Sequence, residues 1–377
     1  MPNLLPSLAC NLDLDLLAAA LPLLEEARVD GLEWSFDALF QTRQVPAWFL
    51  DLLTAFGQEK RLVAHGVFFS LFSGKWSEGQ RQWLKTLSEA SQRYRFDHVT
   101  EHFGFMTGQN FHHGAPLAIP YTATTLAIGQ DRLARIQEAA QCPVGLENLA
   151  FSYSVEDVKR HGEFLEKLIE PVNGFIILDL HNLYCQLHNF SVSFEELIPF
   201  YPLERVREIH ISGGSWEDSL TTPAKKIRRD THDNGVPEEV FNLLTQTLPL
   251  CPNLKYVVLE QLGNSLKTEQ SKTQFYQDYL RMEAIVRDFN ATHLNPIPEP
   301  ERFLPPQATF SAELVEDEAL YAQQVELSSI LETAGSYEEA QQKLRTSTLA
   351  HSAWQVEQWE PAMLETAISL AQKWKKK

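Results

Sequence analysis

Residues 178–189 read LDLHNLYCQLHN and place Asp179, His181 and Asn182 within four positions, directly after the apolar run GFIIL. Two interpretations of this cluster compete. The polar side chains cap a strand and begin a loop, which is common in proteins, or they bind a metal ion. A single stretch does not decide between them. The deciding observation is whether other strands of the same sheet end in similar side chains.

Acidic and imidazole side chains end six successive predicted strands. They are His65 on the third strand, Glu101 and His102 on the fourth, Glu147 and Asn148 on the fifth, Asp179 with His181 and Asn182 on the sixth, His210 on the seventh, and Glu260 with Gln261 on the eighth. The segment RRDTHDNG after the seventh strand adds Asp230 and His232. Any one of these side chains on its own is more often a hydrogen-bonded residue at the rim of a sheet than a ligand.

Their joint occurrence favours a metal site. So many carboxylates at one end of a sheet would repel one another unless cations lay among them or several carboxyl groups were protonated. Imidazole and carboxylate ligands without cysteine suit iron, manganese or zinc. About nine candidate ligands exceed one coordination sphere, so the sequence predicts two or three ions, with Glu147 able to bridge two of them. Asp179 and Asn182 are then expected to be ligands, and His181 to support them.

The elements that would position these residues alternate between short apolar runs and longer segments with helical spacing. The expected strands are 5–12, 31–36, 61–69, 97–105, 143–151, 174–180, 206–214 and 255–262. Segments such as 13–27, 77–94 and 123–140 between them have the periodicity of helices. Eight such units predict a (β/α)₈ barrel, whose functional residues lie at the carboxyl ends of the strands. A doubly wound open sheet is the alternative, but CNLDLD after the first strand contains no glycine-rich phosphate turn.

The sequence also predicts how the chain is divided. Residues 1–292 are expected to form the metal-binding barrel, the proline-rich residues 293–308 a linker, and residues 309–377 a helical extension. The extension carries no chemical motif, and we expect it to pack on the barrel or to contact a partner.

Composition limits which classes of partner the protein is expected to bind and in which cellular compartment it is expected to lie. A net charge of -18 over 377 residues argues against general binding of nucleic acid, which requires a basic surface. The N-terminus lacks the basic region of a signal peptide, and no apolar run is long enough to span a membrane. The four cysteines are widely spaced, a pattern typical of reduced thiols in a cytoplasmic protein.

The strand-end motifs, taken together, resemble the multinuclear non-haem iron-dependent oxidative enzymes, also called the DUF692 family. This family includes the methanobactin-biosynthesis oxidases and belongs to the xylose-isomerase-like TIM barrels. The matching stretches are AHGVFFSL, TEHFGF, PLAIPYT, GLENLAFSYS, ILDLHNLYCQLHNF, REIHISGG, DTHDNGVPEEVF and VVLEQL, which span residues 61–262. We expect the resemblance to cover residues 1–290.

The resemblance implies which residues bind iron. His65, His102 and Glu147 would hold one ion; Glu147, Asp179, His210 and Glu260 would surround a second; Asn182, Asp230 and His232 would hold a third. His65, Glu147, Asp179, His210 and Glu260 would form the catalytic centre. The resemblance further implies two or three irons of mixed Fe(II)/Fe(III) state, with O₂ as co-substrate. The substrate would be a cysteine of a ribosomally made precursor peptide, whose thiolate binds Fe(III) while O₂ is activated at Fe(II).

Two features depart from the family pattern. Many relatives read His-x-x-Gly-His after the seventh strand, whereas HISGGS has Gly214 in place of the second histidine. The helical region after residue 300 is also longer than in typical relatives. Because relatives generally need a separate protein that recognises the leader peptide, this region is expected either to replace such a partner or to dock it.

Other functions remain open from the sequence. A sugar isomerase or epimerase on the same kind of barrel needs fewer ligands and usually a lysine or carboxylate base, and no lysine ends a predicted strand. A metal-dependent phosphodiesterase shares the fold and can bind three metals, but the acidic composition disfavours DNA as its substrate. A non-enzymatic scaffold with a degenerate site is the third class, and the apparently complete ligand set argues against it.

Overall fold

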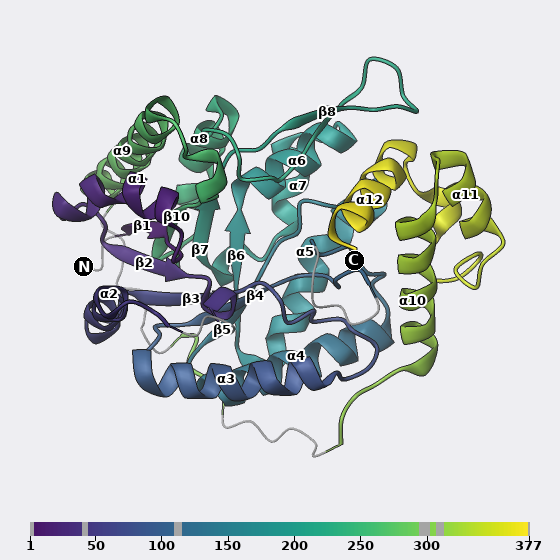
Figure 1. The fold of residues 1–377 in the computed structure, drawn as a ribbon, viewed down its shortest axis with the longest axis horizontal. Coiled ribbons are helices and arrows are strands. Elements are labelled where there is room, and N and C mark those ends of the chain that lie inside the picture. Colours follow the sequence, from purple (N-terminus) through teal and green to yellow (C-terminus); the bar gives the residue numbers. More distant parts are fainter. Residues whose placement is uncertain (1–3, 40–43, 109–114, 294–301, 307–312, 376–377) are drawn as a thin grey trace.

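Eight parallel strands form a closed barrel in the computed structural model, which describes residues 4–39, 44–108, 115–293, 302–306 and 313–375 (Figure 1). The barrel strands are β1 (Leu5–Ala9), β2 (Gly31–Trp34), β3 (Leu62–Gly66), β4 (Val99–His102), β5 (Val144–Glu147), β6 (Phe175–Asp179), β7 (Val206–Ile211) and β10 (Tyr256–Leu259). Each strand pairs with its neighbours in chain order, and β10 closes the barrel against β1. The predicted (β/α)₈ barrel is confirmed.

Helices cover the outside of the barrel between successive strands. They are α1 (Leu14–Glu25), α2 (Ala47–Gln58), α3 (Glu78–Tyr94), α4 (Ala123–Ala140), α5 (Val155–Ile169), α6 (Leu180–Phe190), α7 (Phe194–Leu197), α8 (Glu238–Thr247) and α9 (Glu269–Thr292). Reciprocal capping boxes at Ser77, Thr122, Ser154 and Thr268 start α3, α4, α5 and α9. These caps satisfy the first amides of each helix and fix where each preceding loop ends. Among the described residues, no helix combines the length and the apolar character needed to cross a membrane.

Large rings fill the amino-terminal end of the barrel interior. The His98 ring lies 4.7 Å from that of Phe175 and 5.4 Å from that of Tyr256, measured between centroids. Glycines on adjoining strands make room for them, because a Cβ at Gly145 would lie 2.5 Å from the Phe175 ring and one at Gly31 would lie 3.0 Å from the Tyr256 ring. The barrel is therefore a packed core at this end, and the predicted ligands lie at the opposite end.

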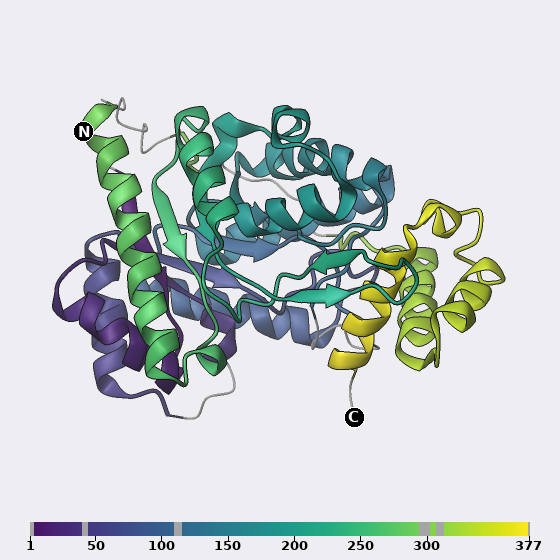
Figure 2. The ribbon, with the colours of Figure 1, turned by 90° about the horizontal axis from the view of Figure 1, so that it is seen from above.

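A short antiparallel hairpin interrupts the barrel pattern between β7 and α8. It consists of β8 (Trp216–Asp218) and β9 (Lys226–Arg228). The hairpin extends from the carboxyl end of the barrel, and β9 lies against α6 (Figures 1 and 2).

Three further helices form what we call the C-terminal helical unit, which lies beside the barrel and the hairpin (Figure 2). They are α10 (Glu318–Thr333), α11 (Tyr337–Arg345) and α12 (Pro361–Trp374), and each contacts the other two. Turns and a short 3₁₀ helix connect α11 to α12, so residues 346–360 are not part of an α-helix. Most of the predicted linker 293–308 falls outside the described residues.

The C-terminal helical unit is attached to loops at the carboxyl end of the barrel. Gln324 of α10 donates to the Phe72 carbonyl at 2.7 Å and accepts from the Gly74 amide at 2.9 Å. The rings of Trp359 and Tyr153 stack with centroids 3.8 Å apart. Because Gln324 is fully buried and satisfied on both sides, this attachment is a specific interface and not a loose contact.

Candidate metal centre

Strand register brings the predicted ligands together at the carboxyl end of the barrel. His102 on β4 is the direct partner of Glu147 on β5, and Asp179 on β6 is the direct partner of His210 on β7. Side chains of a strand alternate between the two faces, so these residues and His65 on β3 all point inward.

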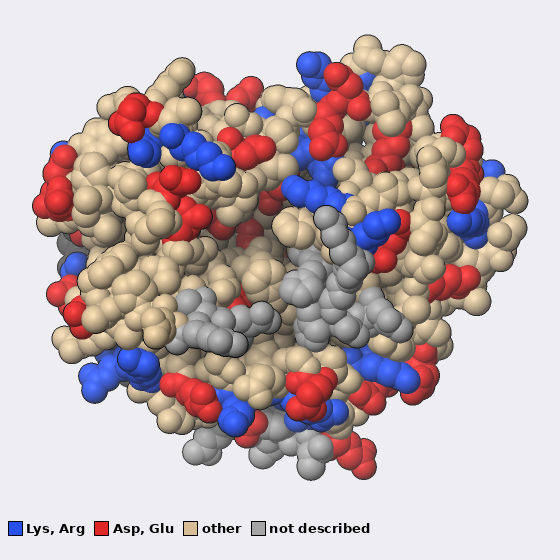
Figure 3. Space-filling view, in the orientation of Figure 1, with Lys and Arg blue, Asp and Glu red and all other residues tan. Residues whose placement is uncertain are grey.

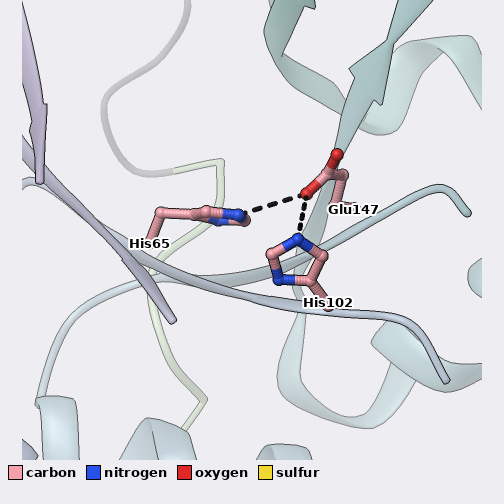
Figure 4. A group of neighbouring side chains, drawn as sticks. All are labelled: His65, His102 and Glu147. Carbon is pink, nitrogen blue, oxygen red and sulfur yellow. Dashed lines mark ion pairs between the residues drawn. The ribbon is translucent and has the colours of Figure 1, made fainter. Parts of the chain in front are cut away.

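The first cluster consists of His65, His102 and Glu147 (Figure 4). Glu147 Oε2 lies 3.2 Å from His65 Nε2 and 3.4 Å from His102 Nε2. His102 Nδ1 lies 2.9 Å from the Gly66 carbonyl, which can only accept, so Nδ1 carries the proton. His102 therefore presents the lone pair of Nε2 toward Glu147 whenever its ring is neutral.

Thr100 orients His65 in the same way. The Thr100 hydroxyl donates to the Ala64 carbonyl at 3.3 Å and lies 2.8 Å from His65 Nδ1, from which it accepts. His65 Nε2 is then free to bind a cation that it would share with Glu147. Metal-binding histidines typically donate their second ring N–H to such a partner, and this bond fixes the tautomer.

The second cluster surrounds His210. Its Nδ1 lies 3.4 Å from Glu260 Oε2, and its Nε2 lies 3.0 Å from Glu33 Oε2. Donor atoms of Glu147, Asp179 and His210 also lie within 4.8 Å of one another. Glu147 thus belongs to both the first and the second cluster, in the position of a bridging ligand.

The third cluster is formed by Asp179, His232 and Glu260, with Asp230 next to it. His232 Nε2 lies 2.8 Å from Asp230 Oδ1, and His232 Nδ1 lies 3.4 Å from Glu260 Oε1. His232 has a φ of +50°, a left-handed conformation that costs energy for a residue other than glycine. Such strain is often found at functional sites.

Asn182 connects the clusters. Its side-chain nitrogen donates to Glu147 Oε1 and to the Asn148 carbonyl, both at 2.9 Å, and its backbone amide donates to Asp179 Oδ1. The Asn148 side chain in turn accepts from the Asp179 amide at 2.6 Å. The amide oxygen of Asn182 is buried and has no hydrogen-bond partner in the described part of the chain.

Among the described residues, many buried polar atoms of these clusters, Asn182 Oδ1 included, have no hydrogen-bond partner. They are Oε1 and Oε2 of Glu33, Nε2 of His65, Oε2 of Glu147, Oδ2 of Asp179, Oδ1 of Asn182, both ring nitrogens of His210, and Nε2 of His232. Buried groups without a partner are rare because each costs about 1 to 3 kcal/mol. Cations among the clusters would satisfy these atoms, so the side chains fit two or three metal ions.

The acid–base properties of the site agree with a need for positive charge. Burial raises the pKa of Asp179 well above its usual range, and the charges of Glu147 and Asp230 raise it further. Burial alone would lower the pKa of His65, but the carboxylates of Glu33 and Glu147 outweigh it and raise that pKa to about 10. Without metal, protons on the imidazoles therefore offset the carboxylates.

Sequence reasoning missed Glu33 as a member of the site. It lies on β2, is 1% exposed, and faces His210. Its position near the carboxyl end of the second strand was the available signal. Nearer the amino-terminal end of the barrel, Glu208 and His98 form a buried pair, with 2.7 Å between Glu208 Oε2 and His98 Nε2. Glu208 Oε1 also lies 3.6 Å from His210 Nε2.

Two residues named at strand ends do not join the clusters. Glu101 accepts from the His102 amide, and its other oxygen crowds Gly66 on the helix-facing side of the barrel. His181 lies behind the ring of predicted ligands, with Nδ1 3.0 Å from Asp230 Oδ1. Gly214, the departure in the seventh motif, has no room for a side chain, because a Cβ would lie 2.1 Å from the Arg229 carbonyl and 2.7 Å from the His181 ring.

Comparisons with known proteins identify the family. The sequence profile described as "RiPP precursor modification enzyme MbnB/TglH/ChrH" matches residues 23–286, where RiPP denotes a ribosomally synthesised and post-translationally modified peptide. A UPF0276 protein of Caulobacter vibrioides is 25% identical over 196 residues, which are 52% of this chain and 66% of that protein. A UPF0276 protein of Acaryochloris marina is 26% identical over 207 residues, which are 54% of this chain and 70% of that protein. The match thus spans just under two thirds of the Caulobacter protein.

Solved structures superpose on the chain at low sequence identity. Endonuclease IV from Thermus thermophilus superposes with a TM-score of 0.48 at 12% identity, covering 75% of this chain and 98% of that one. A xylose isomerase-like TIM barrel protein from Mycobacterium smegmatis superposes with a TM-score of 0.45 at 14% identity, and the match covers 75% of this chain and 97% of that one. The profile, in contrast, covers most of the chain and all nine predicted ligands. The chain belongs to the MbnB/TglH/ChrH family of RiPP precursor modification enzymes.

Proposed function

We propose that this protein is a multinuclear non-haem iron, O₂-dependent oxidase that modifies cysteine residues of a ribosomally synthesised precursor peptide. The observation that carries the proposal is the convergence of the predicted ligands on one barrel mouth: seven of the nine lie in the clusters, Asp230 contacts His232, and Asn182 contacts Glu147. Many of their buried donor atoms have no hydrogen-bond partner among the described residues. Membership of a precursor-modifying enzyme family supports a peptide as the substrate.

The proposed ligand assignment starts from the clusters and adds Asn182 and Asp230, which contact cluster members. His65, His102 and Glu147 would hold one iron, and Glu147, Asp179, His210 and Glu260 a second. Asn182, Asp230 and His232 would contribute to a third. The absence of cysteine from the described clusters matches the hard and intermediate donors that iron accepts. Bound iron would supply a site for a substrate thiolate and the one-electron chemistry that O₂ requires.

The protein's own side chains would orient and shield the centre. Glu147, Asp179 and His210 are buried, whereas the side chains of His102 and Asp230 are 23% and 24% exposed. A space-filling view shows a hollow in this face of the molecule, with acidic atoms in its depth (Figure 3). We infer that a peptide enters from the side of His102 and Asp230, while the buried ligands keep water from the opposite side of the centre.

A metal analysis under anaerobic conditions tests this proposal. The protein is purified without oxygen, its metals are quantified, and a synthetic cysteine peptide is added before air. We expect more than one equivalent of iron, an absorption band from thiolate-to-Fe(III) charge transfer, and peptide-dependent O₂ consumption. Tightly bound zinc or manganese with no response to thiol would instead favour an isomerase or a phosphodiesterase.

A matched pair of variants completes the test. Glu147→Gln removes the anionic bridge between two clusters, and we expect at least one equivalent of iron and the charge-transfer band to be lost. Glu156→Gln changes an exposed glutamate at the start of α5 and should retain both. Equal iron content in the two variants would contradict the proposed role of Glu147.

A further inference from the structure

Arg228 on β9 is a buried cation without an acidic partner. The residue is 5% exposed, and no Asp or Glu oxygen of the described chain lies within ion-pair distance of its guanidinium. Its neighbour Arg229 pairs with Glu217, so the two arginines differ in this respect. Its Nη atoms are not among the fully buried atoms that lack a partner, so they remain accessible from outside, and an external anion can complete this site.

The guanidinium is held firmly on one edge. Its Nε donates to His181 Nε2 at 3.0 Å, so His181 carries its proton on Nδ1 and donates to Asp230 at 3.0 Å. The Asn189 side chain accepts from the Arg228 amide at 2.8 Å and donates to the Arg228 carbonyl at 3.0 Å. Arg228 is thus separated from the predicted ligand Asp230 by a single imidazole ring.

Two aromatic rings that contact each other lie beside the guanidinium. The Arg228 Cζ atom lies 5.0 Å from the centre of the Trp216 ring and 5.6 Å from that of the Tyr184 ring. Nη1 and Nη2 have no hydrogen-bond acceptor among the described residues. A planar guanidinium held beside two rings, with its outer N–H groups unused, is preorganised to bind a carboxylate through two parallel hydrogen bonds.

We propose that Arg228 binds a carboxylate of the substrate peptide and thereby places the cysteine beside the metal centre. The carboxylate is either the peptide's C-terminus or an aspartate or glutamate side chain next to the cysteine. This inference rests on the proposed function for the identity of the substrate as a peptide. Trp216 and Tyr184 form the walls of the site, and His181 fixes its distance from Asp230.

Calorimetric titration of the anaerobic holoprotein with three synthetic peptides tests the site. The peptides are N-acetylated Gly-Ala-Gly-Cys with a free C-terminus, the same peptide as its amide, and Gly-Ala-Asp-Cys amide. We expect at least one of the two carboxylate-bearing peptides to bind roughly 10- to 100-fold more tightly than the neutral amide. The peptide that shows this preference identifies the source of the carboxylate.

Three variants assign the preference to the guanidinium. Arg228→Gln should abolish it, Arg228→Lys should retain only part of it because lysine lacks the planar fork, and Arg229→Gln should leave it unchanged. Metal content is measured for each variant. Equal affinity of the wild type for all three peptides, or an unchanged preference in Arg228→Gln, would overturn the inference. So would loss of metal in Arg228→Gln with full preference in Arg228→Lys, because Arg228 would then only support His181.

The two proposals fail separately. If the protein holds no iron and oxidises no cysteine but keeps the Arg228-dependent preference, the proposed function fails and the carboxylate site remains. If iron-dependent oxidation proceeds equally on acid and amide peptides that bind equally, the carboxylate site fails and the proposed function remains.

Discussion

At the scale of single residues, hydrogen-bond acceptors at Nδ1 determine which atom of His102 and of His65 faces the site. The Gly66 carbonyl accepts a hydrogen bond from His102 Nδ1, and the Thr100 hydroxyl accepts one from His65 Nδ1. Both rings therefore direct Nε2 at the same oxygen of Glu147. A neutral pair of rings would then place two lone pairs against a carboxylate, an arrangement that is stable only with a cation between them.

This argument predicts the effect of replacing Thr100. Thr100→Val keeps the shape of the side chain but removes the acceptor for His65 Nδ1. We expect metal affinity at the first cluster to fall roughly 10- to 100-fold and stability to fall by about 1 to 3 kcal/mol. Competition with a chelator and urea unfolding measure the two effects. Thr247→Val is the matched control, because the buried Thr247 hydroxyl has no hydrogen-bond partner; equal effects in both variants would refute the role of Thr100.

His161, which lies outside the metal centre, should make the stability of the protein depend on pH. Burial lowers the pKa of His161 from 6.5 to about 3, and its Nε2 accepts from the Leu149 amide at 3.0 Å. Below pH 6.5 the unfolded chain binds a proton here that the folded chain does not, so stability falls as the pH falls. Between neutral pH and pH 5 this one group should cost about 2 kcal/mol.

Urea unfolding of wild type and His161→Gln at pH 7 and pH 5 measures this contribution. Glutamine can accept the same amide but does not titrate, so the variant should lose about 2 kcal/mol less stability between the two pH values. Identical pH dependence in the two proteins would show that His161 does not contribute.

At the scale of elements, the strands were predictable and the insertions were not. Each barrel strand is an apolar run that ends in polar residues, and both features can be read from the sequence. Glu33 could have been found in the same way, but it stands alone between Leu32 and Trp34 without a neighbouring polar residue. The β8–β9 hairpin could not be predicted, because its strands are three residues long and depend on contacts with α6 and α12.

The contact between the hairpin and α12 yields a prediction for Glu365. Its carboxylate accepts from the amides of Leu220 and Thr221 and from the Ser219 hydroxyl, so one side chain fixes the tip of the hairpin. Glu365→Gln replaces one acceptor oxygen with a donor. We expect at least tenfold faster amide hydrogen exchange at residues 219–222, because hydrogen bonds to charged groups contribute about 1.5 to 3 kcal/mol.

Hydrogen-exchange mass spectrometry measures this effect, with Glu338→Gln on the exposed face of α11 as the control. Unchanged exchange in Glu365→Gln would show that the hairpin tip is held by other contacts. Because Arg228 lies on the same hairpin, a looser tip should also weaken binding of the carboxylate peptides.

At the scale of the whole molecule, the C-terminal helical unit touches several of the loops that surround the metal centre. Gln324 holds the loop after β3, the Trp359 ring covers Tyr153 in the loop after β5, and Glu365 holds the hairpin after β7. These contacts join residues far apart in the sequence, which is why periodicity alone could not predict them. We propose that the unit holds these loops in place around the proposed peptide site.

This view predicts that the barrel and the C-terminal helical unit remain associated without a covalent connection. A cleavage site for a specific protease is inserted between residues 308 and 309, and the protein is cut under native conditions, so that Phe303, which packs on Phe175, stays with the barrel. The interface contains a stacked aromatic pair and a fully buried, satisfied glutamine, so we expect the two fragments to elute together at micromolar concentration. Trp359→Ala removes the stack at a cost of about 3 to 5 kcal/mol, and the cut variant should separate. Co-elution in wild type would make residues 309–377 part of the catalytic body, whereas separation would make them an independent domain and remove the basis for their role in the peptide site.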